Sequence, residues 1–115
     1  MKLSAFLRHL DTSPELVTFD DTMALIDSLY EYTPTRFRNG ALVNEAGQNN
    51  GSCKLFAFAG LHGLSQQQTL NCFGAYYRDD VLKHPAGTDH QNIRNFIKSG
   101  WEGVEFDGSA LRLKP

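Results

Sequence analysis

The segment from Cys53 to Ala59 is apolar on nearly every side of the helix that it would form. It reads Cys-Lys-Leu-Phe-Ala-Phe-Ala, and Lys54 is its one charged residue. A helix that is hydrophobic all round has no face suited to solvent, so it is usually buried on most sides. We therefore predict that this helix is the central element of the fold and that the other elements pack around it.

Four amphipathic helices are predicted around this central segment. Capping boxes, in which Ser or Thr is followed three residues later by an acid or Gln, mark three of their starts: Thr18-x-x-Asp21, Ser65-x-x-Gln68 and Thr88-x-x-Gln91. Apolar residues recur at helical spacing in each. The inward stripes are Leu3, Phe6, Leu7 and Leu10; Phe19, Met23, Ile26 and Tyr30; Thr69, Phe73, Tyr76 and Tyr77; and Ile93, Phe96 and Ile97. In the last helix this stripe leaves Asn92 and Arg94 on the exposed side.

Two short β-hairpins are predicted at turn signals. Asn39-Gly40 separates residues 36–38 from 41–43, which would place Phe37 opposite Leu42. Asp107-Gly108 separates residues 104–106 from 111–113, which would pair Val104 with Leu111. The sequence therefore predicts an α+β fold, with about five helices around one core and one or two short antiparallel β-hairpins that cover one side of it.

Length and charge restrict the class of protein. The chain has 115 residues and no composition change or linker, so we expect a single domain over residues 1–115. A net charge of −2 argues against DNA binding, which needs a cation for each neutralised phosphate. The N-terminal apolar run is broken by Arg8, His9 and Asp11, which excludes a signal peptide or a membrane span there. We expect no membrane association.

The two cysteines, Cys53 and Cys72, indicate no disulfide framework and no zinc site. Their number and spacing fit neither a set of bridges nor a Cys/His ligand pattern, so reduced thiols are expected. His84, Asp89 and His90 lie within seven residues, but their spacing matches no metal motif. We predict neither a metal nor a cofactor.

Polar residues are denser between Phe37 and Lys54 than a loop requires. This region is locally basic and ends where the central helix begins, so free backbone N–H groups and the helix dipole could hold an anion there. The structural alternative is that the short polar side chains simply cap the helix and complete turns. No Walker P-loop is present, because the residue before Lys54 is not glycine. The candidate ligand-binding residues are Arg36, just before this segment, and, within it, Arg38, Asn39, Glu45, Asn49, Asn50, Ser52 and Lys54.

A second polar segment, residues 84–94, adds Asp89 and Arg94 to the candidate ligand-binding residues. We interpret both segments as one surface of a non-enzymatic binding or regulatory domain. Its partner would be a small anion or another protein.

An enzymatic alternative starts from Cys53. A cysteine in the first turn of a helix tends towards the thiolate, and His84 or His90 could serve as its base if the fold brought one within hydrogen-bond reach. Glu45 is a further candidate general base. The structural alternative is a buried packing role, which is common for free cysteine. Burial of the Cys53 sulfur in the core would exclude this mechanism.

Several long blocks of the sequence resemble the HopJ type III effector family. The blocks are residues 32–40, 43–54, 72–74, 76–78, 81–85, 89–94 and 100–103. The resemblance as a whole covers nearly the whole chain. The resemblance implies a shared fold, and the family supplies no catalytic residues, cofactor or activity to assign here. Its name implies delivery into host cells, whereas the immediate start of an amphipathic helix at Leu3 favours a resident bacterial cytosolic protein. A translocated effector is the alternative.

Overall fold

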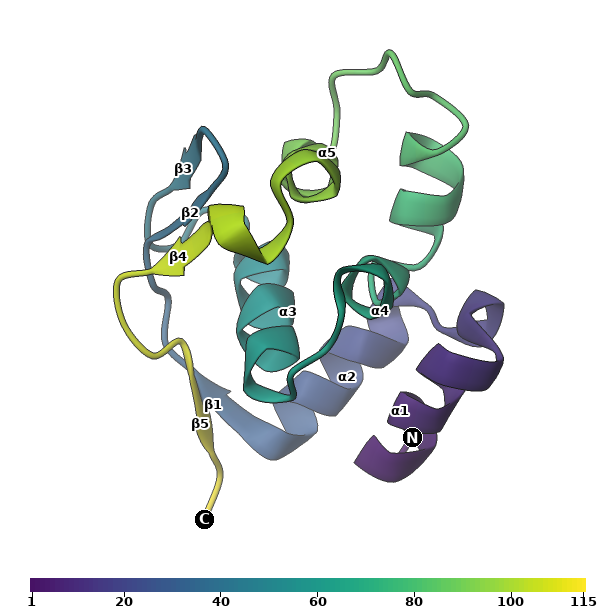
Figure 1. The fold of residues 1–115 in the computed structure, drawn as a ribbon. Helices are drawn as coiled ribbons and strands as arrows, with labels where there is room; N and C mark the ends of the chain where they lie inside the picture. The colour runs from purple at the N-terminus through teal and green to yellow at the C-terminus, as the bar shows by residue number, and fades with distance from the viewer.

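The computed structural model describes residues 1–115 and has five α-helices and five short strands (Figure 1). The helices are α1 (Leu3–Thr12), α2 (Phe19–Leu29), α3 (Asn50–Leu61), α4 (Gln66–Asn71) and α5 (Gln91–Ser99). The strands are β1 (Tyr30–Tyr32), β2 (Phe37–Asn39), β3 (Leu42–Asn44), β4 (Val104–Phe106) and β5 (Leu111–Leu113). Shorter helical turns are Pro14–Leu16 and Gly100–Gly103, of 3₁₀ type, and Tyr76–Val81, of π type. The α+β prediction is confirmed.

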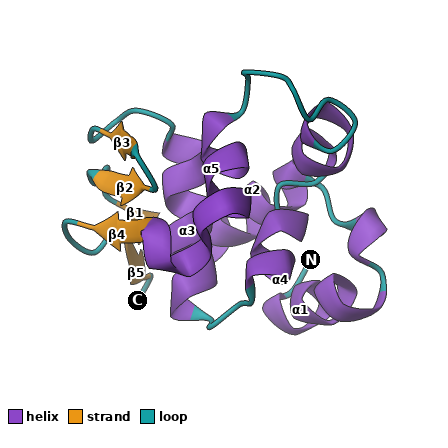
Figure 2. Cartoon of the chain, turned by 45° about the horizontal axis from the view of Figure 1, so that its top comes forward, coloured by secondary structure: helices purple, strands orange, loops and turns teal.

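Helix α3 occupies the centre of the fold, as its apolar sequence predicts. Its residues Cys53, Leu55, Phe56, Phe58 and Ala59 are all fully buried. Full burial of a Leu or Phe side chain stabilises a fold by about 1.5–3 kcal/mol, so this helix supplies a large share of the core. The helices lie on one side of α3 and the strands gather on the other (Figure 2).

The strands form two small antiparallel sheets, β1-β5 and β3-β2-β4. Residues 30–40 run antiparallel to residues 103–113, with Tyr30 opposite Leu113 in the β1–β5 pair and Phe37 opposite Phe106 in the β2–β4 pair. The predicted hairpin between residues 104–106 and 111–113 is therefore wrong, because each of these strands pairs with a distant segment. The chain bends at Asp107-Gly108, and the strand that follows, β5, pairs with β1 and not with β4.

The β2–β3 hairpin is present, although its register differs from the prediction. Asn39 pairs with Leu42, so the two loop residues are Gly40 and Ala41, and Phe37 lies opposite Asn44 rather than Leu42. The partner of Phe37 thus differs from the predicted one by two positions, and residues two apart in a strand point to the same face. The side chains of Phe37 and Asn44 are both buried.

Gly74 ends the helix that the pattern of residues 65–84 predicts as continuous. Its φ is +62°, and a Cβ there would lie 2.8 Å from the backbone nitrogen of Phe19. Only glycine takes this conformation without strain at such a close approach. The chain therefore leaves α4 at Asn71 and continues as the π-helical turn, whose first residue, Tyr76, is 44% exposed and not inward as predicted.

Two of the three predicted capping boxes are confirmed. Thr18 with Asp21 caps α2, and Ser65 with Gln68 caps α4. The third is wrong, because α5 begins after His90, and Gln91 donates a hydrogen bond to the Thr88 carbonyl instead. None of the helices is long and apolar enough to cross a membrane.

Candidate functional site

A pocket of about 640 Å³ opens where the N-termini of α3 and α5 meet. We call it the α3–α5 pocket. It combines polar residues from the two helix starts with aromatic residues from α2 and from the chain around Gly74. Its lining residues are Phe19, Leu42, Asn49, Gly51, Ser52, Phe73, Tyr76, His90, Gln91, Asn92 and Ile93.

Both helix starts at this pocket leave backbone N–H groups free. Asn49 and His90, which precede α3 and α5, have φ of 51° and 50° and supply no side-chain cap. Among the next residues, the N–H groups of Gly51 and Ser52 in α3 and of Gln91 and Asn92 in α5 have no hydrogen-bond acceptor in the chain. Helix N-termini with free N–H groups carry partial positive charge and favour anions. Two such ends therefore contribute positive potential to one pocket.

Aromatic rings form the other wall of the α3–α5 pocket. The ring of Phe19 stacks on Phe73 at 6.2 Å between centroids and meets Tyr76 edge-on at 5.3 Å, and Tyr76 lies 5.1 Å from the His90 ring. Phe19 also packs closely on the start of α3, since a Cβ at Gly51 would lie 2.8 Å from its ring. These contacts give the pocket an aromatic wall beside its polar one.

Four asparagines connect the sheet to both helix starts. The Asn92 side-chain oxygen accepts hydrogen bonds from Asn39 at 3.0 Å and from Asn44 at 3.1 Å, and the Asn92 amide donates to Asn44 at 2.9 Å. Asn49 donates to the same Asn44 oxygen at 2.7 Å. Because Asn39, Asn44 and Asn92 are buried, these bonds form in a region of low dielectric. The network fixes the relative positions of the α3 and α5 starts.

Arg94 holds the loop that leads into α5. Its guanidinium donates to the carbonyl oxygens of His84 and Asp89 at 2.9 and 2.6 Å and pairs with the Asp89 carboxylate at 2.7 Å. That contact lowers the pKa of Asp89. Arg94 is only 8% exposed and Asn92 6%, so the prediction that both are exposed is wrong. Their polar groups are buried because backbone and side-chain partners surround them.

The structure brings the two predicted polar segments together at the α3–α5 pocket. Asn49 and Ser52 from the first segment and His90 from the second line it, and His90 is hydrogen-bonded to Asp80 at 3.1 Å. Asn39 does not line the pocket but bonds to Asn92, which does, and Asp89 and Arg94 bond to each other in and after the loop that leads into α5.

The remaining candidates of the first segment lie elsewhere, in exposed or half-exposed ion pairs and hydrogen bonds. Such pairs contribute little to stability. They are Arg36 with Glu45 at 3.4 Å and with Asp107 at 3.2 Å, Arg38 with Glu105 at 3.0 Å, Lys54 with Asp27 at 2.9 Å, and Asn50, which accepts from the Tyr32 hydroxyl at 2.6 Å.

The Cys53 sulfur is fully buried, which excludes the thiol mechanism on the criterion stated above. The thiol donates to the Thr35 carbonyl at 3.5 Å. Burial and the Cys53 thiol together raise the pKa of the nearby Tyr32 phenol. His84 is exposed, and His90 contacts Asp80 and Tyr76. Cys72 is also buried, which raises the pKa of its thiol to about 12.

The lining residues that were not among the sequence candidates include Phe19, Phe73, Tyr76 and Asn92. The aromatic residues were assigned to core stripes, and Gly74 was the available signal that Tyr76 leaves its stripe. No local signal marks Asn92, because its partners are 48 and 53 residues away in the chain. No group of three or more His, Cys, Asp or Glu side chains is arranged to hold a metal ion.

A family model and a solved structure each match nearly the whole chain. The chain is similar to a crystal structure of the unknown-function protein VPA0580, with 54% sequence identity and a TM-score of 0.97 over 99% of this chain and 95% of that one. No curated protein matches it. The family model described as HopJ type III effector protein matches residues 3–111. The chain therefore belongs to the HopJ type III effector family.

Proposed function

We propose that this protein is a small binding domain of the bacterial cytosol. Its α3–α5 pocket would hold a small organic anion that carries a flat apolar group. The anionic end lies against the free N–H groups of Gly51, Ser52, Gln91 and Asn92, and the flat group lies against the Phe19 and Tyr76 rings.

The observation that carries this proposal is the convergence of two uncapped helix N-termini on one pocket. A capping side chain would occupy the same N–H groups that an anion needs, as Ser65 does at α4. The pocket volume of about 640 Å³ is within the range of small-molecule sites. Because the aromatic wall is part of the same pocket, phosphate alone would fill only its polar part.

No lysine or arginine lines the α3–α5 pocket. The attraction for an anion therefore comes from N–H groups and helix dipoles, each worth less than a full charge. We expect a dissociation constant on the order of 1 mM for inorganic phosphate, and tighter binding of phenyl phosphate, which also buries an apolar ring.

The test compares Ser52→Asp with Ser4→Asp in calorimetric titrations with phenyl phosphate. Ser52 is in the first turn of α3 at the pocket, whereas Ser4 is an exposed residue in the first turn of α1. Both variants place a carboxylate at a helix start, where it is tolerated. A carboxylate at residue 52 repels the ligand, so we expect Ser52→Asp to weaken binding at least about tenfold.

Ser4→Asp, which adds the same charge far from the pocket, should bind as the wild type does. Equal affinities for the two variants, or no binding of phenyl phosphate to the wild type at 10 mM (a concentration of about ten times the expected phosphate constant), would refute the proposal.

The translocated-effector alternative is supported by the family's name. Its test is fusion of the first residues of the chain to a reporter, followed by measurement of the reporter's export through a type III apparatus. Export of the reporter would support the translocated-effector alternative, and retention of the reporter in the bacterial cell would support the cytosolic location.

A further inference from the structure

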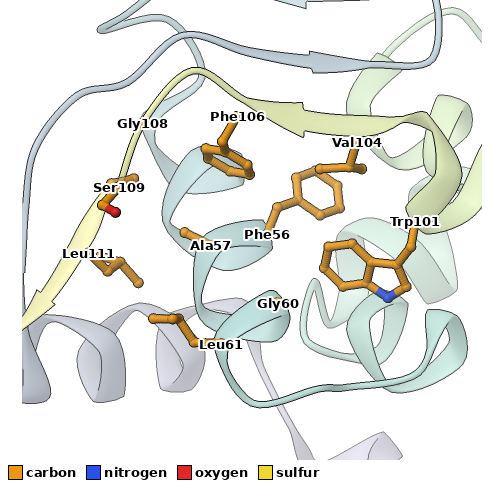
Figure 3. A pocket seen from close by; sticks show the side chains of 11 residues that line it. Phe56, Ala57, Gly60, Leu61, Trp101, Val104, Phe106, Gly108, Ser109 and Leu111 are labelled. Carbon is orange, nitrogen blue, oxygen red and sulfur yellow. The ribbon is translucent and has the colours of Figure 1, made fainter.

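A second hollow, of about 300 Å³, lies at the opposite end of α3, beneath β4. We call it the β4 cleft. Figure 3 shows Phe106 and Val104 on the side of β4 that faces Phe56 of α3, with Trp101 at one end and Leu61 and Leu111 along the rim. Leu61 is 60% exposed, and Val104, Phe106 and Trp101 are each half-buried. The cleft is thus an apolar hollow that is open to solvent.

The backbone of β4 is unpaired along the edge beside this cleft. Towards β2, the Gly40 N–H donates to Gly103 and the Asp107 N–H donates to Arg36. Backbone groups alternate sides along a strand, so the N–H and C=O of Phe106 and the C=O of Val104 point away from β2. β4 is the last strand in the order β3-β2-β4, and no strand covers that side.

The chain along the open edge is acidic, and one of its carboxylates, Glu102, has no ion pair. Between Ser99 and Leu111 the chain has three acidic residues, Glu102, Glu105 and Asp107, and no lysine or arginine. Arg38 and Arg36 pair with Glu105 and Asp107 from the β2 side, whereas Glu102 is exposed without an ion pair. Exposed apolar edges are often protected by lysine, and this one is not.

We propose that the open edge of β4 binds an extended peptide segment of a partner protein. The segment adds as a strand beside β4 and pairs with the Phe106 backbone. One apolar side chain enters the β4 cleft, and a neighbouring lysine or arginine of the segment lies near Glu102. Main-chain bonds give such strand additions their affinity, and side-chain pockets give them specificity.

The unpaired backbone favours a peptide over the other possible occupants. A small apolar ligand would fill the cleft and leave the Phe106 N–H and C=O unused. A second copy of this chain would bring no lysine or arginine on its own β4 to pair with Glu102. A basic, extended peptide can pair with the free backbone groups of β4, fill the β4 cleft with an apolar side chain and place a positive charge near Glu102.

The test begins with a phage-displayed library of random linear twelve-residue peptides, selected on the wild-type protein. An enriched peptide is then synthesised with a fluorescent label, and its binding is measured by anisotropy. Leu61→Lys places a charged side chain at the rim of the β4 cleft. Leu16→Lys is the matched control, because Leu16 is also 60% exposed but lies outside the cleft. Both changes are at exposed positions, so both variants should fold.

We expect enriched peptides to contain an apolar residue beside lysine or arginine. Leu61→Lys should weaken binding at least about tenfold, whereas Leu16→Lys should leave it unchanged. Methylation of alternate backbone nitrogens in the peptide should weaken it similarly, because it removes the strand hydrogen bonds. Phenyl phosphate binding should be the same in both variants, which keeps this test separate from that of the α3–α5 pocket.

Three results would overturn the proposal. The first is a selection that enriches no peptide. The second is equal binding to Leu61→Lys and Leu16→Lys, or binding that backbone methylation does not affect. The third is self-association of the wild type that Leu61→Lys abolishes, which would identify the occupant as a second copy of the chain.

Discussion

The two ends of α3 open into hollows of opposite character. At its N-terminus, the α3–α5 pocket presents free N–H groups that a buried network of asparagines holds in place. Towards its C-terminus, the β4 cleft presents apolar side chains beside an unpaired strand edge. A fixed array of donors suits a small ligand of defined shape, whereas an open edge suits another chain. One buried helix thus separates two sites that different classes of partner would use.

The largest effect should come from the asparagine network behind the α3–α5 pocket. Asn92→Leu removes the partner of Asn39 and Asn44 and leaves buried polar groups unpaired. We expect a loss of about 4 kcal/mol in the free energy of unfolding, measured by urea denaturation. The control Asn71→Leu removes one side-chain bond, to Gln67, at the surface and should cost about 0.5 kcal/mol. Similar losses in the two variants would show that the network does not support the pocket.

The next largest effect is expected at Gly74, whose conformation places Tyr76 at the α3–α5 pocket. Comparison with Gly63 separates the cost of backbone strain from the cost of a steric clash. Gly74 and Gly63 have φ of +62° and +61°, but only at Gly74 would a Cβ meet another part of the chain. Gly63→Ala should therefore cost about 1 kcal/mol from backbone strain alone. Gly74→Ala should cost about 3 kcal/mol in the same unfolding measurement, because the Phe19 backbone must also move. An equal cost at both positions would show that the contact with Phe19 is unimportant.

A smaller effect concerns pH at the C-terminal end of α3. Burial lowers the pKa of His62 below its usual 6.5, and its ring is hydrogen-bonded to the Tyr30 hydroxyl at 2.8 Å. The unfolded chain therefore binds the proton more strongly than the folded one. Stability that is present above pH 6.5 is lost as the pH falls from 6.5 towards the folded pKa.

This pH effect can be measured by urea unfolding at pH 7.5 and at pH 5.5, with His62→Gln as the comparison. The wild type should lose more stability than His62→Gln between the two pH values. If the wild type and His62→Gln lose the same free energy of unfolding between pH 7.5 and pH 5.5 (which lie about one pH unit on either side of 6.5), His62 is not the group involved.

Local patterns predicted the parts of this fold that depend on neighbouring residues. The burial of α3, the caps of α2 and α4, and the presence of the β2–β3 hairpin, although not its register, are each determined by a short stretch of sequence. The strands β4 and β5 were predicted, but their partners were not, because an apolar strand pairs with any edge that the rest of the fold provides. Asn92 and Arg94 were predicted to be exposed because the apolar stripe of their helix points the other way, and the polar groups that surround them come from other parts of the chain. Hydrophobic spacing shows which face of a helix is apolar, but it does not show whether distant polar groups will pack against the polar face and bury it.

The polar side of the candidate site could be predicted from the sequence, and its aromatic side could not. The sequence placed polar residues at the starts of two helices and assigned them to one surface, and the structure brings Ser52 and His90 to one pocket. The aromatic wall depends on Gly74, whose close contact with the α2 start is a property of the assembled chain.

An NMR titration of the ¹⁵N-labelled protein with phenyl phosphate tests directly whether the two helix starts form one anion site. If they do, the amide resonances of Gly51, Ser52, Gln91 and Asn92 shift together, with one dissociation constant, and ring-current shifts appear at Tyr76. Shifts confined to a single helix start, or centred on other residues while these four amides stay unchanged, would contradict it.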